Sequence, residues 1–86
     1  MSEIWVQLPN NEKILLKVSS ITWNLKVIYN GEELCKINSR GGSSVFNIGE
    51  NKVELEYKTS MLWGTQKIII KFNGEKIYEN KLIMGM

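Results

Sequence analysis

The chain has 86 residues, of which 43% are hydrophobic and 23% are charged, and its formal net charge is +2. It contains neither histidine nor aspartate, which excludes Ser-His-Asp and Cys-His catalytic arrangements and every histidine metal site. We therefore expect one globular domain that is not an enzyme and that holds no cofactor and no metal.

Apolar and polar residues alternate along almost the whole chain, a pattern that predicts strands and leaves no segment with helical spacing. Seven to nine short strands in one domain over residues 1–86 predict an all-β fold, an antiparallel β-sandwich of two sheets. The predicted strands are Glu3–Leu8, Glu12–Val18, Thr22–Tyr29, Glu32–Ile37, Val45–Ile48, Lys52–Thr59, Thr65–Phe72 and Glu75–Asn80, and the tail 81–86 either pairs as a last short strand or frays.

Two Asn-Gly pairs, Asn30-Gly31 and Asn73-Gly74, predict two-residue hairpins because both turn positions need positive φ. The residues around these pairs echo each other between segments 26–33 and 69–76. Two independent hairpins account for the echo. A pair of sheets, each built around one such hairpin, would produce the same echo.

The segment Asn38–Ser44 follows the first predicted hairpin and carries no residue suited to a core. We expect a mobile linker there. The alternative is an anion-binding nest, in which Arg40 supplies charge and the neighbouring glycine amides donate hydrogen bonds.

Several strand and turn motifs follow one another in a fixed order: Trp5-Val6-Gln7-Leu8, a strand with Ile14, Val27-Ile28-Tyr29-Asn30-Gly31-Glu32, Val45-Phe46-Asn47-Ile48-Gly49, the Lys52–Thr59 strand, and Ile68–Phe72 closed by Asn73-Gly74-Glu75-Lys76-Ile77. Their order and spacing over residues 4–80 resemble one domain of the Fas apoptotic inhibitory molecule family. The resemblance implies a compact antiparallel β-sandwich without enzymatic activity, in a cytosolic protein associated with cell survival and with the handling of misfolded proteins. It carries over no functional residue. The chain also departs from the family in having one domain where two are usual.

The loop between the strands at 52–59 and 65–72 is apolar, although loops that run over a surface are normally polar. It places Met61, Leu62 and Trp63 in succession. One interpretation is contact with a partner, because Trp and Met are enriched at the centres of interfaces. The other is that the loop folds back and plugs one end of the sandwich.

A second group of apolar residues falls on the otherwise polar side of the predicted strands. This group consists of Trp5, Leu15, Ile28 and Ile69. If their strands are neighbours, the four residues form an exposed patch of the kind that marks an interaction surface. If a β-bulge reverses one strand, the assignment of faces is wrong for that strand.

Three tryptophans, Trp5, Trp23 and Trp63, stand among lysines and raise the possibility of an oligonucleotide-binding barrel. Trp23, however, shares one face of its predicted strand with Leu25 and Val27, so we expect it in the core. The remaining aromatic residues are too few for a base-stacking platform, and the lysines alternate with glutamates. We therefore do not expect nucleic acid as a partner.

Cysteine usage and the ends of the chain bear on its compartment. Lone Cys35 cannot form an internal disulfide; we expect it to be buried apolar filler in a protein of a reducing compartment. The start of the chain shows no signal peptide, and no apolar run is long enough to span a membrane. We expect a cytoplasmic protein without a membrane partner.

These expectations combine into a cytoplasmic, non-catalytic protein-binding module. Its predicted contact residues are Met61, Leu62 and Trp63 of the apolar loop, with Trp5 and Ile69 of the outward strand face. The partner is another protein, with a homodimer as a further possibility. The alternative function is a small inhibitor, encoded by a phage or mobile element, that binds and blocks a host protein; brevity and A+T-rich residue usage fit it.

Overall fold

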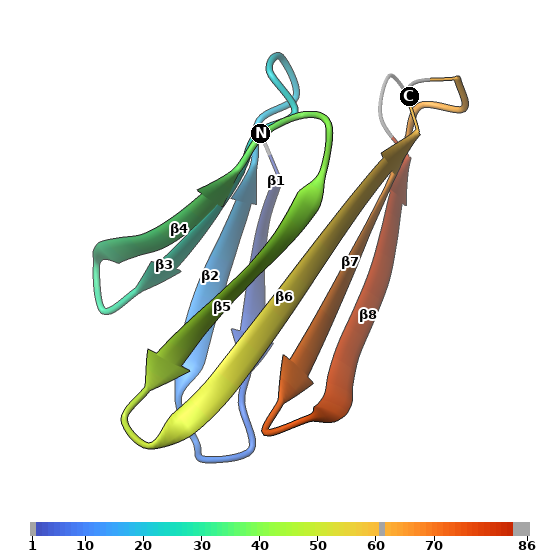
Figure 1. Ribbon diagram of the computed structural model, residues 1–86. Coiled ribbons are helices and arrows are strands. Elements are labelled where there is room, and N and C mark those ends of the chain that lie inside the picture. Colours follow the sequence, from blue (N-terminus) through green and yellow to red (C-terminus); the bar gives the residue numbers. More distant parts are fainter. Residues whose placement is uncertain (1, 61, 84–86) are drawn as a thin grey trace.

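The chain folds into two β-sheets that pack face to face (Figure 1). The computed structural model describes residues 2–60 and 62–83. All elements in these residues are antiparallel strands, so the prediction of an all-β, two-sheet sandwich is confirmed. The strands are β1 (Ser2–Gln7), β2 (Lys13–Val18), β3 (Leu25–Tyr29), β4 (Glu32–Ile37), β5 (Gly42–Ile48), β6 (Asn51–Ser60), β7 (Thr65–Phe72) and β8 (Glu75–Ile83).

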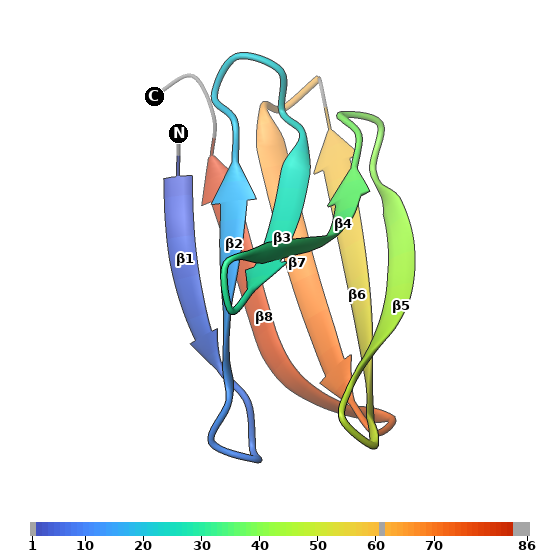
Figure 2. The same cartoon turned by 90° about the vertical axis from the view of Figure 1, so that its left-hand side faces the viewer.

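Each sheet is a meander in which every strand pairs with the next one along the chain. The first sheet has the order β1-β2-β3-β4 and the second the order β5-β6-β7-β8. The chain crosses from one sheet to the other between β4 and β5, and Figure 2 shows the resulting two layers. Strands β1, β4, β5 and β8 are therefore the edges of the sandwich.

The last two strands of each sheet are joined by a hairpin of the same type. Asn30 and Gly31 join β3 to β4, Asn73 and Gly74 join β7 to β8, and all four have positive φ as a type I′ turn requires. In each sheet the register shifts by one residue just beyond the turn, near Val27/Ile28 and near Ile70/Lys71. The echo in the sequence thus reflects two sheets built around equivalent hairpins.

The core lies between the sheets and consists of the inward-facing residues of both. Alternation places these side chains on one face of each strand, where they lose contact with water; burying each one stabilises the fold by about 1.5–3 kcal/mol. The largest fully buried side chain is that of Tyr57, which is 1% exposed. Other core residues are Val6, Leu8, Ile14, Leu16, Val18, Leu25, Val27, Ile37, Ile48, Val53, Leu55, Ile68, Ile70 and Phe72.

The predicted start of the third strand at Thr22 is wrong, because β3 begins at Leu25. The hydroxyl oxygen of Ser19 accepts hydrogen bonds from the backbone N–H groups of Ile21 (3.2 Å) and Thr22 (3.1 Å), which holds these residues in a turn. Trp23 lies in the same connection, with φ at 63° and its side chain half-buried. The expectation that Trp23 belongs to a core strand is therefore also wrong.

The segment expected to be a mobile linker is largely ordered. Strand β5 begins at Gly42 instead of Val45, and Gly42 pairs with Tyr57. The hydroxyl of Thr59 donates a hydrogen bond of 2.8 Å to the carbonyl of Ser39, which ties this segment to the second sheet. Gly41 lets the backbone approach β6 closely, so the segment is held without any large side chain. At the other end of the chain, residues 81–83 extend β8 and pair with β7.

We expect Gly41→Ala to be far more costly than Gly74→Ala. Both glycines have φ near +85°, the left-handed region that disfavours other residues by about 1–2 kcal/mol. A Cβ at Gly41 would also lie 2.5 Å from the backbone carbonyl oxygen of Tyr57, whereas a Cβ at Gly74 meets nothing within 4 Å. Urea unfolding should show a loss above about 3 kcal/mol for Gly41→Ala and about 1–2 kcal/mol for Gly74→Ala. Equal losses of unfolding free energy in the two variants would contradict the close approach of Gly41 to the backbone of β6.

Candidate functional site

Three connections lie together at one end of the sandwich, which we call the loop end. They are residues 19–24 between β2 and β3, residues 38–41 between β4 and β5, and residues 62–64 before β7 (Figures 1 and 2). Met61, one of the predicted contact residues, lies outside the described residues. The others can be placed.

Apolar side chains protrude from the loop end. Leu62 is 84% exposed and Trp63 is 75% exposed, so neither plugs the sandwich. Ile21, on the neighbouring 19–24 connection, is 91% exposed and was missed by the sequence reasoning. The signal that could have found it is a lone isoleucine after Ser19-Ser20, in a position where turn chemistry competes with the strand.

The 19–24 connection presents Ile21 on a fixed framework. The backbone N–H of Ser19 donates to the carbonyl of Asn24 (3.1 Å), and the N–H of Trp23 donates to the carbonyl of Ser19 (2.9 Å). The hydroxyl of Tyr57, from the second sheet, donates to the carbonyl of Trp23 at 2.9 Å. These bonds order the connection in advance, so a contact made by Ile21 costs little conformational entropy.

A second apolar surface lies on the outer face of the first sheet. Trp5 stands opposite Leu15, and Leu15 stands opposite Ile28, so the three form one row across β1, β2 and β3, which we call the outer row. The expectation that these residues share a face of neighbouring strands is correct. Trp5 is 65% exposed, but Leu15 is only 8% exposed although it lies outside the core cluster, because the side chains on either side cover it.

A depression of about 400 Å³ adjoins the outer row. It is lined by Trp5, Ile28 and residues 11–13 and 30–31, at the start of β2 and in the β3–β4 hairpin. On one side the hydroxyl of Tyr29 donates a hydrogen bond of 2.9 Å to the Glu12 carboxylate, and this bond raises the pKa of Tyr29. The turn and the hairpin that border the depression are thus tied together.

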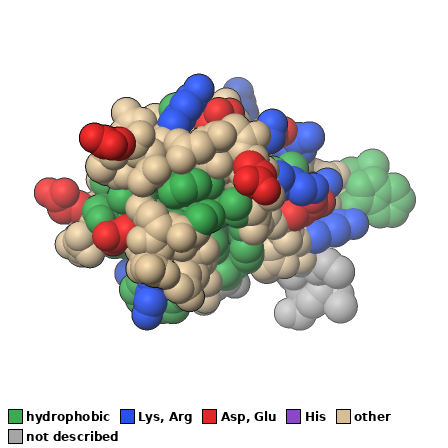
Figure 3. Space-filling model, turned by 90° about the horizontal axis from the view of Figure 1, so that it is seen from below, with side chains coloured by type: hydrophobic (Ala, Val, Ile, Leu, Met, Phe, Trp, Pro, Cys, Tyr) green, Lys and Arg blue, Asp and Glu red, His purple; other side chains and the backbone are tan. Residues whose placement is uncertain are grey.

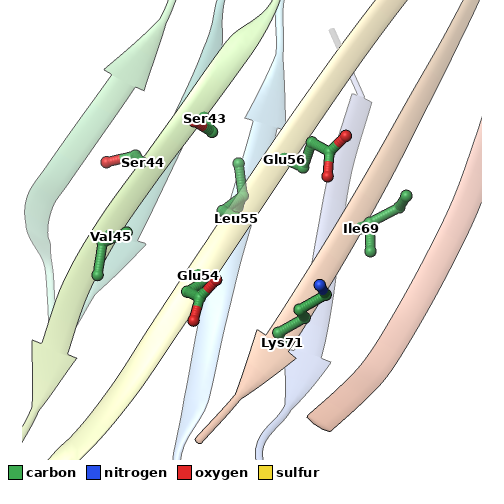
Figure 4. Close-up of a pocket in the computed structure, with 8 residues that line it drawn as sticks. All are labelled: Ser43, Ser44, Val45, Glu54, Leu55, Glu56, Ile69 and Lys71. Atoms are coloured by element: carbon green, nitrogen blue, oxygen red, sulfur yellow. The ribbon is translucent and has the colours of Figure 1, made fainter. Parts of the chain in front are cut away.

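The expected place of Ile69 beside Trp5 is wrong. Ile69 lies on the outer face of the second sheet, opposite Glu56 on β6 and Glu79 on β8. It lines a shallow depression of about 90 Å³ together with Val45 and Lys71 (Figure 4). The error has a plain cause, since alternation assigns a face of a strand but not the sheet to which that strand belongs.

The carboxylate of Glu79 neutralises part of that second outer face. Lys76 and Lys67 contact it at 2.6 Å and 3.0 Å, and their hydrogen bonds lower its pKa to about 2. Ile69 therefore stands in a network of ion pairs, a setting unlike that of the outer row.

A row of lysines separates the outer row from the loop end. Lys17, Lys26 and Lys36 lie directly opposite one another on β2, β3 and β4. Glu3 approaches Lys17 at 3.9 Å and Glu33 approaches Lys26 at 3.8 Å, both at exposed positions where such pairs contribute little. We call the three lysines the basic row.

Comparison with known proteins gives no further guide. Neither a known protein family, nor a curated protein, nor a solved structure matches this chain. In the described residues no three His, Cys, Asp or Glu side chains gather as a metal site, and no helix there has the length and apolarity to cross a membrane.

Half-buried Cys35 has its pKa raised by burial, which disfavours the reactive thiolate. The apolar surfaces are the features that indicate function.

Two polar side chains lie buried beneath the loop end. Burial raises the pKa of Tyr57 to about 12. The Tyr57 hydroxyl donates its hydrogen bond to the carbonyl of Trp23, and the fully buried Gln66 amide has no hydrogen-bond partner among the described residues. The first group supports the loop end, and the second weakens the core next to it.

We expect Tyr57→Phe to lower the unfolding free energy by about 1 kcal/mol at neutral pH, because the carbonyl of Trp23 loses its donor. The variant should also lose less unfolding free energy than the wild type when the pH is raised into the alkaline range. The pKa of a tyrosine in an unfolded chain is about 10, whereas the pKa of Tyr57 in the folded protein is about 12. As pH rises from about 10 to about 12, the unfolded state therefore loses its proton first, and the unfolding free energy falls. Urea unfolding at neutral pH and at about pH 11 checks this; the same fall in both proteins would contradict it.

We expect Gln66→Met to raise the unfolding free energy by about 1 kcal/mol or more, because it replaces a buried amide without partners by an apolar side chain of similar length. Gln7→Met on the exposed outer face of β1 is the matched control and should change stability little. Thermal and urea unfolding measure both. A loss of stability in Gln66→Met would mean that the amide is satisfied in solution.

Proposed function

We propose that this chain is a cytoplasmic, non-catalytic protein-binding module whose contact surface is the outer row. The observation that carries the proposal is the exposure of Trp5 beside Leu15 and Ile28, next to a depression that a partner side chain can enter. An exposed tryptophan beside apolar neighbours is a frequent hot spot of protein interfaces. The lone half-buried Cys35 is consistent with a reducing compartment.

The edge of the first sheet supports the same surface. Among the described strands β1 pairs with β2 alone, so its other side presents backbone N–H and C=O groups that a partner strand can use. Trp5 projects from this edge strand, so a strand added to β1 would lie beside the indole ring. Backbone pairing would then supply affinity, and the outer row would supply specificity.

The other predicted contact residues are not part of this surface. Ile69 lies on the second sheet, and Leu62 and Trp63 lie at the loop end, beyond the basic row. A partner that covered all of them would have to wrap around the sandwich. The link to the Fas apoptotic inhibitory molecule family, with its role in survival and protein handling, stays a prediction.

Trp5→Ser tests the proposal, with Val45→Ser as a matched control on the other sheet. Both residues are exposed apolar side chains on the outer faces of edge strands, 65% and 59% exposed. We expect both variants to stay folded. Trp5→Ser should unfold at a somewhat lower urea concentration than the wild type because it uncovers Leu15, and Val45→Ser should unfold at nearly the wild-type concentration. The partner captured by the wild type from the source cell should bind Trp5→Ser at least about tenfold more weakly in a titration and should bind Val45→Ser unchanged.

Sedimentation of the purified chain decides whether the partner is a second copy. Self-association that Trp5→Ser abolishes and Val45→Ser retains would identify a homodimer through the outer row. Binding that neither substitution changes, or that both weaken equally, would overturn the proposal.

A further inference from the structure

We propose that the loop end docks onto an anionic lipid surface, with Ile21, Leu62 and Trp63 entering the headgroup region. This contact goes beyond the proposed protein contact and uses different residues, because the outer row lies on a sheet face and the loop end lies at the end of the sandwich (Figures 1 and 2). Shape, charge and order of the loop end each support it.

The first support is the way the apolar side chains protrude. Ile21 lies on one connection, and Leu62 and Trp63 lie on another. Each of the three residues is at least 75% exposed. A protein partner would need a separate pocket for each of these projections. A lipid interface accepts separate apolar side chains at a common depth, and tryptophan favours that interface because its ring is apolar with one polar N–H group.

The second support is the distribution of charge along the sandwich. We divide each sheet across its strands at the same distance from its Asn-Gly hairpin. The last row on the loop side contains Lys26 in the first sheet and Ile69 in the second, each three residues before the aromatic residue that precedes Asn-Gly. The loop side then holds seven Lys or Arg residues and three glutamates, a net charge of +4, and the hairpin side holds four lysines and six glutamates, a net charge of −2. The loop-side residues are Glu3, Lys17, Lys26, Lys36, Arg40, Glu56, Lys58, Lys67, Glu79 and Lys81.

The hairpin side has the opposite character. Six glutamates outnumber four lysines on this side. Figure 3 views the sandwich from the end opposite the loop end and shows these acidic side chains among lysines and apolar side chains. An anionic surface therefore attracts the loop end and repels the other end, so the charge orients the molecule as it approaches.

Lysine rows cross both sheets on the loop side. The basic row spans the first sheet, and Lys58, Lys67 and Lys81 lie directly opposite one another on the second. Like charges that face one another across strands disfavour the folded state. Glutamates pair with four of these six lysines at the surface. The long lysine side chains can also extend toward lipid phosphates while their stems stay on the sheet, which relieves the remaining repulsion when an anionic surface is near.

The third support is order. The Tyr57 hydroxyl fixes the carbonyl of Trp23, and the Thr59 hydroxyl fixes the carbonyl of Ser39, so β6 holds two of the three connections. Ile21 is therefore already in place before any contact. Docking on a surface needs no membrane-spanning segment, so the short apolar runs of the sequence do not bear on it.

The test is co-sedimentation of the purified full chain with lipid vesicles. We expect binding to vesicles of equimolar phosphatidylcholine and phosphatidylserine, weakening as salt is raised, and little binding to phosphatidylcholine alone. Tryptophan emission should shift to shorter wavelength on binding, and the shift should be lost in Trp63→Phe with its smaller, non-indole ring. Trp63→Ser and Ile21→Ser should each weaken binding by about fivefold or more, and Val45→Ser should leave it unchanged.

Two lysines on β6 give a matched pair for the charge requirement. Lys58 and Lys52 are similarly exposed, and each forms an ion pair with a glutamate two residues away, Glu56 at 3.1 Å and Glu54 at 3.4 Å. Lys58 lies on the loop side and Lys52 on the hairpin side. Lys58→Glu should weaken binding to the anionic vesicles by about fivefold or more, and Lys52→Glu should change it far less.

Each contrary result overturns the proposal. Absence of vesicle binding would do so, and so would binding that survives both Trp63→Ser and Ile21→Ser, since lysines alone would then account for it. Equal effects of Lys58→Glu and Lys52→Glu would show that the vesicles attract the protein by its overall charge and not by its loop end. Binding to an acidic protein or to nucleic acid through the same residues, without vesicle binding, would assign the loop end to that class instead. A failure here does not bear on the proposed Trp5 contact, because that contact is tested by the binding of Trp5→Ser to a protein partner and not by vesicle binding.

Discussion

The inner faces of the two sheets can leave water only by packing on each other, and the rest of the molecule follows from that requirement. An 86-residue chain has enough apolar side chains for one such layer, from Ile14 and Leu16 on the first sheet to Ile68 and Ile70 on the second. Apolar residues beyond that layer have no inner face to join. Trp5, Leu62 and Trp63 are therefore left in solvent, and this makes them informative about function.

The sequence predicts well whatever depends on neighbours along the chain. Alternation locates the strands, and each Asn-Gly pair gives a type I′ turn because its two residues alone determine the backbone there. Prediction fails where distant residues decide: the Tyr57 hydroxyl reaches Trp23 across 34 positions and the Thr59 hydroxyl reaches Ser39 across 20, and these bonds shape the segments read as strand and as linker. For the candidate sites, the face of Trp5 and Leu15 could be read from alternation. The separation of Ile69 could not, because it depends on how the strands divide between sheets.

The two surfaces proposed for binding are compatible on one molecule. The outer row lies on a sheet face, the loop end caps the sandwich, and the basic row lies between them. A molecule docked by its loop end would stand with its long axis away from the lipid and with the face that carries Trp5 open to the side. The chain would then hold a protein partner next to a membrane, which is an adaptor role and needs no catalysis.

The meander order of the sheets also governs how the chain reaches its structure. Within residues 2–60 and 62–83, every ladder joins strands that are adjacent in sequence, and the chain changes sheets once, at residues 38–41. Sandwiches with crossed connections must close long loops before their strands can pair, whereas here each four-stranded sheet can assemble from its own contiguous half. The single non-local event is the meeting of two preformed halves, so we expect this β protein to fold quickly for its class.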